Sequence, residues 1–420
     1  MLIRDSLTKN TLVRSITALS LLQIMNYVFP FITIPYVVRV LGVEKFGVVS
    51  FAAAFTSYFY LLIDFGFNFS ATKEISINRD DRQKLSETII SVYIIRGVLF
   101  FVASLIFVIC LYTVPLFTKD KLLYLFSFIS VSGALLYPQW YFQGIEKMGT
   151  ITIVTFISRL LIVILIFVLI KTESDYRTYA LLNSAGSIII GLLGILFLKR
   201  YFLVWKVPTY SMIIQTCKES GVMFLSTLSI NLYTSSNTFI LGLFASPYIV
   251  GYWSAADKLR LAAQGLISPI TQGLYPHMSA KFNSSKETAI KFLRKGFYPI
   301  TILGLTVSLL LYFFAEPIVA IALGEDFTNS ILILKAISFL PFIILLSNIF
   351  GIQILLNLNG SKEFSLIVLF AGIFNVCLSL IIVPKLFAIG TAISAMITEI
   401  IVTFLTAYYA KIKLRGTDGL

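Results

Sequence analysis

The sequence is poor in charged residues and in the side chains that most enzymes use for catalysis. Only 13% of its 420 residues are Asp, Glu, Lys or Arg, and it holds one histidine and three cysteines. A soluble domain of this length needs a far more polar surface. The lone histidine, His277, weakens every mechanism that depends on histidine, and three dispersed cysteines give neither a disulfide framework nor a metal-ligand spacing. We therefore expect neither a metal site nor a cofactor.

What the chain has in abundance is apolar sequence, at 58% of its residues, in runs that recur from end to end. A helix needs roughly 20 apolar residues to cross a bilayer. Breaks at clusters of Lys, Arg, Gly and Pro predict an all-α integral membrane protein of about twelve transmembrane helices. The predicted spans are 15–38, 46–67, 88–111, 122–142, 150–170, 179–198, 221–244, 250–276, 297–321, 329–355, 363–383 and 387–410.

Positive charge is unevenly distributed between the two sets of connections. The net charge is +13, and 21 of the 33 Lys and Arg residues lie in connections on one side of the predicted spans, against 7 on the other. The positive-inside rule assigns the richer side to the cytoplasm. We expect a multi-pass membrane protein with both termini in the cytoplasm. No basic patch with interleaved aromatic residues lies outside the spans, so nucleic acid is not an expected partner.

The chain divides into two halves of similar pattern. The longest connection predicts an N-terminal six-helix lobe over 1–200, a cytoplasmic linker over 201–218 and a C-terminal six-helix lobe over 219–420. Gly47-Val-Val-Ser50 resembles Gly251-Tyr-Trp-Ser254, and each follows a Leu-Gly pair by a few residues. Parallel repeats of this kind predict two lobes around a central cavity, with the substrate handled between them.

Eight ionisable residues fall inside predicted spans, and the basic ones outnumber the acidic ones. A charge near the bilayer centre costs at least about 2.5–3.5 kcal/mol, so such groups usually face a bundle interior or a wet cavity. The surplus of positive charge predicts an anionic ligand, while ion pairing within the protein, as between Asp257 and Arg260, is the structural alternative. The predicted anion contacts are Arg96, Arg159, Lys258, Arg260 and Lys335, and the residues predicted to couple ions or hold these bases are Asp64, Asp257 and Glu399.

Polar side chains recur every three or four residues on several spans, so each set lies on one helix face. Hydrogen bonding between helices is one reading of such stripes, and a cavity that receives a hydroxyl-rich ligand is the other. The residues predicted to line it are Gln23, Asn26, Ser57, Asn68, Asn231, Thr234, Gln264, Thr271 and Tyr275.

Motifs of catalysis are missing from the sequence. It holds no Walker-type phosphate loop, zinc motif or nucleophile elbow. The outer connections are too short for the folded domain on which many membrane polymerases and glycosyltransferases carry their chemistry. We expect a transporter rather than an enzyme, and a membrane polymerase or acyltransferase is the less favoured alternative.

Four sequence segments resemble one family of transporters. They are "RVLGVEKFGVVSF" (39–51), "LLIDFGFNFSATKEI" (61–75), "NRDDRQKLSE" (78–87) and "YWSAADKLRLAAQGLISPITQGLYPHMS" (252–279). The chain is similar in these segments to the polysaccharide-transport family of O-antigen and capsule flippases, within the multidrug/oligosaccharidyl-lipid/polysaccharide exporter superfamily.

The resemblance implies a flippase of the bacterial inner membrane for undecaprenyl-pyrophosphate-linked oligosaccharide repeat units, which moves them from the inner to the outer leaflet by alternating access. It implies H⁺ or Na⁺ as a counter-ion, and a polymerase and chain-length proteins of the same pathway as partners. Two alternatives are a flippase for another lipid-linked glycan and a multidrug or cation antiporter of the same superfamily. The antiporter should have a net acidic cavity, whereas the buried charge here is net basic.

Overall fold

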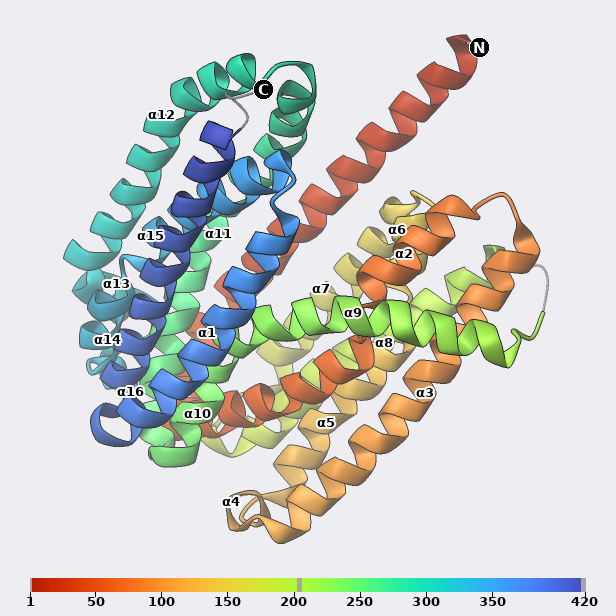
Figure 1. The fold of residues 1–420 in the computed structure, drawn as a ribbon. Coiled ribbons are helices and arrows are strands. Elements are labelled where there is room, and N and C mark those ends of the chain that lie inside the picture. Colours follow the sequence, from red (N-terminus) through yellow and green to blue (C-terminus); the bar gives the residue numbers. More distant parts are fainter. Residues whose placement is uncertain (1, 202–205, 417–420) are drawn as a thin grey trace. The chain divides into compact units, whose positions relative to one another are not determined.

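The computed structural model describes residues 2–201 and 206–416, and within these ranges every regular element is a helix (Figure 1). In lipid a backbone must satisfy its own polar groups, and a helix does so within each span. The all-helical membrane fold predicted from hydropathy is thereby confirmed. The structure gives the backbone alone for residues 2–28, 200, 201, 226, 233, 234, 276, 280, 283, 286, 294, 295 and 416.

The chain forms two compact units. Unit 1 comprises Met1–Thr33 and Ala52–Leu228, and unit 2 comprises Ile34–Phe51 and Ser229–Leu420. The predicted lobes 1–200 and 219–420 and the linker between them differ from this grouping in three places. Residues 34–51 group with unit 2, residues 219–228 group with unit 1, and residues 210–218 of the predicted linker are helical.

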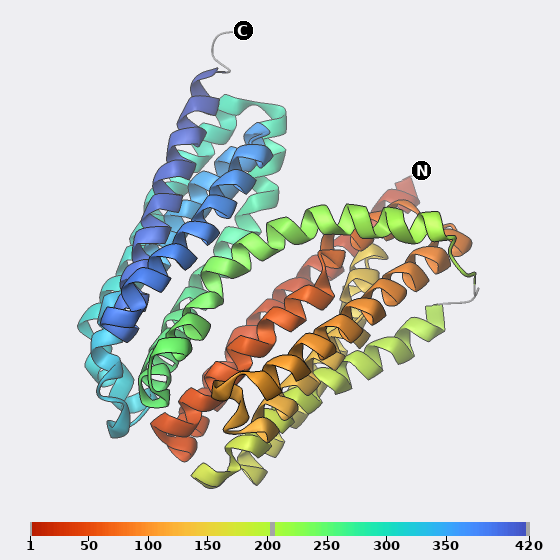
Figure 2. The ribbon, with the colours of Figure 1, turned by 60° about the horizontal axis from the view of Figure 1, so that its bottom comes forward.

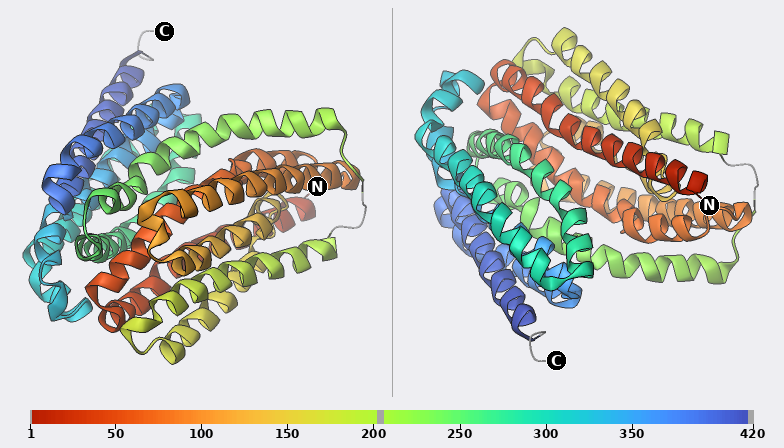
Figure 3. Two further views of the ribbon diagram at one scale, coloured as in Figure 1. Left: turned by 90° about the horizontal axis from the view of Figure 1, so that it is seen from below. Right: turned by 90° about the horizontal axis from the view of Figure 1, so that it is seen from above.

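Unit 1 is a helical bundle that contains most of the N-terminal half of the chain. Within it, α5 packs along α8, and α2 packs on the short α6 (Figure 3). At the first crossing a side chain on Gly133 would meet the backbone of Ser187, so glycine allows the close approach. Its elements are most of α1 (Leu2–Asp64), α2 (Phe67–Ile77), α3 (Arg82–Thr113), α4 (Pro115–Thr118), α5 (Lys121–Leu136), α6 (Gln139–Gly144), α7 (Met148–Leu169), α8 (Tyr176–Tyr201) and most of α9 (Tyr210–Thr234).

Unit 2 is a bundle around α11 and α16, both of which contact several other helices (Figure 2). A π-helical turn, Ile349–Leu355, interrupts the tenth predicted span. The helices of this unit are α10 (Ser236–Phe244), α11 (Pro247–Ser284), α12 (Lys286–Phe313), α13 (Ala315–Ala322), α14 (Ser330–Ile337), α15 (Leu340–Asn348) and α16 (Ser361–Gly416).

Two backbone breaks divide α1 and α16 into two spans each. Gly42 has φ 68° and ψ 174°, and Phe387 has φ 47° and ψ −122°. Around Phe387 the chain reverses direction (Figure 1). As a result, Lys413 near the end of α16 lies 2.9 Å from Glu363 near its start. Eight helical stretches in the described chain are long and apolar enough to cross a membrane. Two of them, Phe29–Ile77 and Ser361–Arg415, contain the breaks at Gly42 and Phe387. The twelve predicted spans fall in helical parts of the chain, and some of them, including 122–142, 221–244, 297–321 and 329–355, run across a short break between two helices.

The connections of unit 1 gather into two groups separated by the length of α3. In one group the turn after α2 and the turn after α6 meet through Arg79 and Glu146 at 3.5 Å, and Lys206 before α9 lies 3.0 Å from Glu87. In the other group Arg177 at the start of α8 lies 3.0 Å from Asp120 before α5. This alternation agrees with the predicted order of spans, and the first group is the one predicted to face the cytoplasm.

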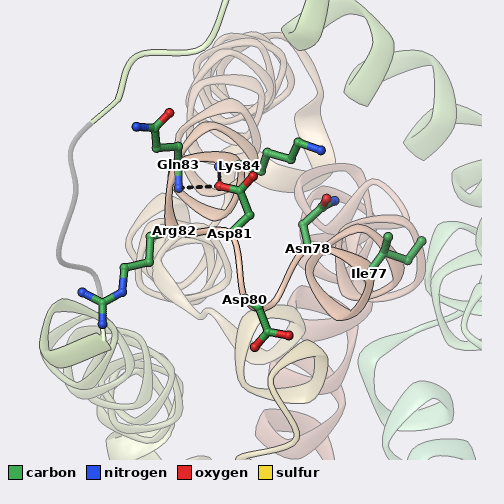
Figure 4. Close-up of a pocket in the computed structure, with 7 residues that line it drawn as sticks. All are labelled: Ile77, Asn78, Asp80, Asp81, Arg82, Gln83 and Lys84. Carbon is green, nitrogen blue, oxygen red and sulfur yellow. Dashed lines mark hydrogen bonds between the residues drawn. The ribbon is translucent and has the colours of Figure 1, made fainter.

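Figure 4 shows the turn between α2 and α3 in the first group. The side chain of Asp81 accepts hydrogen bonds from the backbone N–H groups of Gln83 (3.0 Å) and Lys84 (3.1 Å). It therefore caps α3 and satisfies two of the N–H groups that have no partner within the helix. This cap explains why the charged segment after α2 ends one span and begins the next.

The paired glycines of the internal repeat meet within unit 2. A side chain on Gly47 would lie 1.9 Å from the carbonyl oxygen of Pro247, and one on Gly251 would lie 2.2 Å from that of Val43. These residues let α1 and α11 cross with their backbones nearly in contact. The internal similarity read from the sequence thus corresponds to a helix crossing.

Candidate functional site

Arg96, on α3, is enclosed by protein in unit 1. Its residue is 2% exposed. Nη1 donates hydrogen bonds to the carbonyl oxygens of Ala134 (3.1 Å) and Tyr137 (2.9 Å), and Nη2 lies 3.6 Å from Oδ1 of Asp64. The guanidinium thus satisfies carbonyl groups at the C-terminal end of α5, which have no partner within that helix.

Aromatic rings and a second polar residue complete this enclosure. The guanidinium carbon of Arg96 lies 5.5 Å from the ring centre of Phe67 and 5.8 Å from that of Trp140. Asp64 also accepts a hydrogen bond of 2.7 Å from Nδ2 of Asn68. The structure therefore places the predicted residues Arg96, Asp64 and Asn68 together, bonded mainly to one another and to the backbone.

Arg159, on α7 of the same unit, has a different environment. It is half-buried, and no hydrogen bond or ion pair joins it to another residue in the described part of the chain. One turn before it, the ring of Phe156 lies 5.7 Å from that of Phe29 on α1. The side chains of Gln23 and Asn26, predicted to line a cavity, lie outside the part that the structure describes.

In unit 2, three predicted residues of α11 form one hydrogen-bonded row. Nε of Arg260 donates to Oδ1 of Asp257 at 2.7 Å, and Nη1 donates to Oε1 of Gln264 at 2.6 Å. The ion pair named above as the structural alternative is therefore present. Glu399 of α16 is 8% exposed and forms no ion pair with a described residue.

The two predicted lysines lie in more open positions. Lys258 is exposed on α11, next to the paired Asp257. Lys335, in the last turn of α14, is half-buried and lines a surface pocket with Glu316 and residues 386–389. Neither lysine has a carboxylate within 4.0 Å among the side chains that the structure describes.

The hydroxyl groups predicted to line a cavity bond mostly to their own helices. Ser57 donates to the carbonyl oxygen of Ala54 at 2.7 Å, and Thr271 donates to that of Ser268 at 2.9 Å. Tyr275 is exposed, Asn231 accepts a bond from Ser235, and the side chain of Thr234 lies outside the described part. In the described residues, no group of three His, Cys, Asp or Glu side chains is placed to hold a metal ion.

Sequence reasoning missed two buried polar contacts in unit 2. Nε2 of Gln353, in the π-helical turn, donates to the carbonyl oxygen of Thr271 at 2.8 Å, and Nδ2 of Asn375 donates to Oγ1 of Thr398 at 3.1 Å. The sequence signal that could have indicated both contacts is an amide side chain within an apolar run. The first contact joins the π-helical turn to α11, and the second joins the two parts of α16 on either side of its break at Phe387.

Known proteins resemble this chain over most of its length. The family described as "Polysaccharide biosynthesis protein" matches residues 12–282. A protein of Escherichia coli (strain K12), described as "Putative O-antigen transporter", is 32% identical over 405 residues, which cover 96% of this chain and 97% of that one. A protein of Shigella dysenteriae with the same description is 30% identical over 396 residues, covering 93% and 97%.

Solved structures share the fold at low sequence identity. The lipid II flippase MurJ in an inward closed conformation has a TM-score of 0.72 at 16% identity, covering 94% of this chain and 86% of that one. An inward-facing multidrug resistance MATE family transporter of the MOP superfamily has a TM-score of 0.69 at 14% identity, covering 96% and 99%. At these identities the likeness concerns the fold alone.

Proposed function

Because the chain belongs to the polysaccharide biosynthesis protein family, we propose that it is a flippase for lipid-linked oligosaccharides. It moves undecaprenyl-pyrophosphate-linked repeat units of an O-antigen or capsule from the inner to the outer leaflet. It works by alternating access in the bacterial inner membrane, with both termini in the cytoplasm. A gradient of H⁺ or Na⁺ supplies the free energy.

The relatives support the class of substrate. Two proteins that align with nearly the whole chain are each described as "Putative O-antigen transporter". A protein of similar fold is a lipid II flippase. A protein of this fold can therefore carry a glycan attached to a lipid. The fold by itself does not favour this function over multidrug export, because the MATE transporter shares it.

The single observation that carries the proposal beyond family likeness is the environment of Arg159. A cation within a membrane span is costly unless it is compensated, and no carboxylate among the described side chains compensates this one. An arginine presents a planar fork of donors that matches phosphate oxygens in pairs. In a site of low dielectric constant its attraction for a pyrophosphate exceeds the attraction in water. We assign Arg159 as the main anion contact.

Arg96 and Arg260 are less suited than Arg159 to contact an anion. Both have carboxylate partners, Asp64 and Asp257, so their charges are largely neutralised within the protein. Glu399 is the candidate for ion coupling, since it is a buried carboxyl group that has no ion-pair partner among the described side chains. The hydroxyl and amide side chains of the spans then meet the sugars.

A leaflet-resolved glycolipid measurement in cells tests this function. In a strain without the gene, lipid-linked repeat units should accumulate in the inner leaflet and surface polymer should be absent. The gene should restore both, and a gene carrying Lys119→Gln, which removes an exposed charge outside the spans, should restore them equally. Normal amounts of the intermediates in the outer leaflet of the deletion strain would contradict the proposal.

The same strain distinguishes the alternative glycans. Supplying repeat units of several compositions should restore polymer only for those that the protein carries. If peptidoglycan precursors accumulate instead of polymer repeat units, the protein is a flippase for another lipid-linked glycan. If neither accumulates and the cells become sensitive to organic cations, the antiporter reading replaces ours.

A further inference from the structure

A pocket at one end of unit 2 contains a basic and an acidic side chain that do not pair with each other. Its walls come from the start of α11, from α13, from α14 and the connection before it, and from the bend of α16. The polar side chains that line it include Lys335, Glu316 and Asn329, and most of the rest are apolar. The three connections that meet here, near residues 249, 328 and 387, are all predicted to face the outside.

Contacts among the walls give the pocket a fixed shape. Oγ of the fully buried Ser330 donates to the carbonyl oxygen of Tyr252 at 3.0 Å and ties α14 to α11. The ring of Tyr252 packs edge-on against Phe327 at 6.1 Å. Phe387, with its positive φ, sets the bend that brings residues 386–389 to the pocket. The pocket is therefore built by side chains rather than left by a loose loop.

The helix dipoles explain where each charge lies but not why both charges line one pocket. Glu316 is in the first turn of α13 and Lys335 is in the last turn of α14, and each position is electrostatically favourable for its charge. No ion pair within 4.0 Å joins either of them to another side chain in the described part of the chain. Two opposite charges that share a pocket without pairing leave room for a ligand with complementary charges.

We propose that this pocket binds the headgroup of a phospholipid that carries one phosphate and one primary ammonium group, as phosphatidylethanolamine does. The ammonium group of Lys335 contacts the phosphate, and the carboxylate of Glu316 accepts hydrogen bonds from the lipid ammonium. Exposed apolar side chains at the rim, Leu332 and Leu386, contact the acyl chains. The inference stands apart from the proposed flippase activity.

The charges of the pocket select among lipids. A choline headgroup has no N–H to donate to Glu316, so it forms the phosphate contact alone. A headgroup with net negative charge, including a lipid pyrophosphate, meets Lys335 but is repelled by Glu316. The expected order of affinity is therefore ethanolamine above choline and glycerol headgroups.

Native mass spectrometry of the purified full-length protein in detergent tests the proposal. Phosphatidylethanolamine, phosphatidylcholine and phosphatidylglycerol with the same acyl chains are added in turn, and the bound fraction of each is measured. Wild-type protein should retain the ethanolamine lipid best. Lys335→Met should reduce that retention by about tenfold, as expected when one charged hydrogen bond is lost. Glu316→Gln should abolish the preference over phosphatidylglycerol.

Two control variants remove neighbouring charges that do not line the pocket. Lys385→Met and Glu325→Gln change exposed residues at the same end of unit 2 and should leave lipid retention unchanged. Equal retention of all three lipids by wild-type protein would overturn the proposal. Preferential retention of phosphatidylglycerol would overturn it too and would indicate a simple anion site. Because Glu316 is exposed, its variant should fold and give a result even if Lys335→Met does not.

Discussion

Two arginines of unit 1 lie within predicted spans, and their surroundings differ sharply. Arg96 on α3 has an acidic partner, two carbonyl groups and two aromatic rings around it. Arg159 on α7 has no partner among the described side chains. The same residue type inside the same bilayer therefore supports two different roles. The partners of a buried charge, rather than its depth in the membrane, therefore indicate whether the charge stabilises the fold or binds a ligand.

The largest expected effect is on the stability of the Arg96 enclosure. Arg96→Met should destabilise the protein by about 3–5 kcal/mol, because it leaves Asp64 buried without its partner. Thermal unfolding in detergent measures this loss. The double variant Arg96→Met/Asp64→Asn should recover part of the stability. An Arg96→Met protein as stable as wild type, yet inactive, would mean that Arg96 contacts substrate after all.

Arg159 should show the opposite pattern. Arg159→Gln should lower the restoration of surface polymer by about tenfold or more, the loss expected when a charged contact to phosphate is removed. Its unfolding temperature should stay close to that of wild type, because no described partner is left unpaired. Arg159→Lys keeps the charge but loses the paired geometry, and it should retain intermediate activity. Full activity of Arg159→Gln would remove the distinction between the two arginines.

Of the three predicted effects, the one on the ion pair of α11 should be the smallest. Arg260 and Asp257 are three residues apart on one helix and are partly accessible. Pairs of this kind contribute about 0.2–1 kcal/mol. A double-mutant cycle of Arg260→Gln and Asp257→Asn, read by thermal unfolding, should return a coupling energy in that range. A coupling as large as that of Arg96 with Asp64 would show that unit 2 holds an equally essential pair.

Hydropathy and charge were sufficient to predict the membrane fold, and the reason is physical. Each span must be apolar over the thickness of the bilayer, so its position is recorded in consecutive residues. The contact between Asp257 and Arg260 was also predictable, because residues three apart share one helix face. The internal repeat located Gly47 and Gly251, which meet at a helix crossing.

The surroundings of the buried charges could not be predicted in the same way. Arg96 bonds to carbonyl groups 38 and 41 positions away, and apolar periodicity does not record which helices pack side by side. Lys335 lines a surface pocket together with residues 386–389, which lie far along the sequence. Residues 34–51 of α1 also group with unit 2, because the close crossing at Gly47 and Gly251 packs that segment against α11. Such contacts depend on tertiary packing.

The most direct test of the proposed function is transport by purified protein in lipid vesicles. Undecaprenyl-pyrophosphate-linked repeat units are placed in one leaflet, and their arrival in the other is followed by enzymatic labelling of the sugar. Vesicles with wild-type protein or Lys119→Gln should move the lipid at equal rates, and Arg159→Gln should slow the movement by about tenfold or more. No movement by wild-type protein under any H⁺ or Na⁺ gradient, or equal movement by Arg159→Gln, would contradict the account.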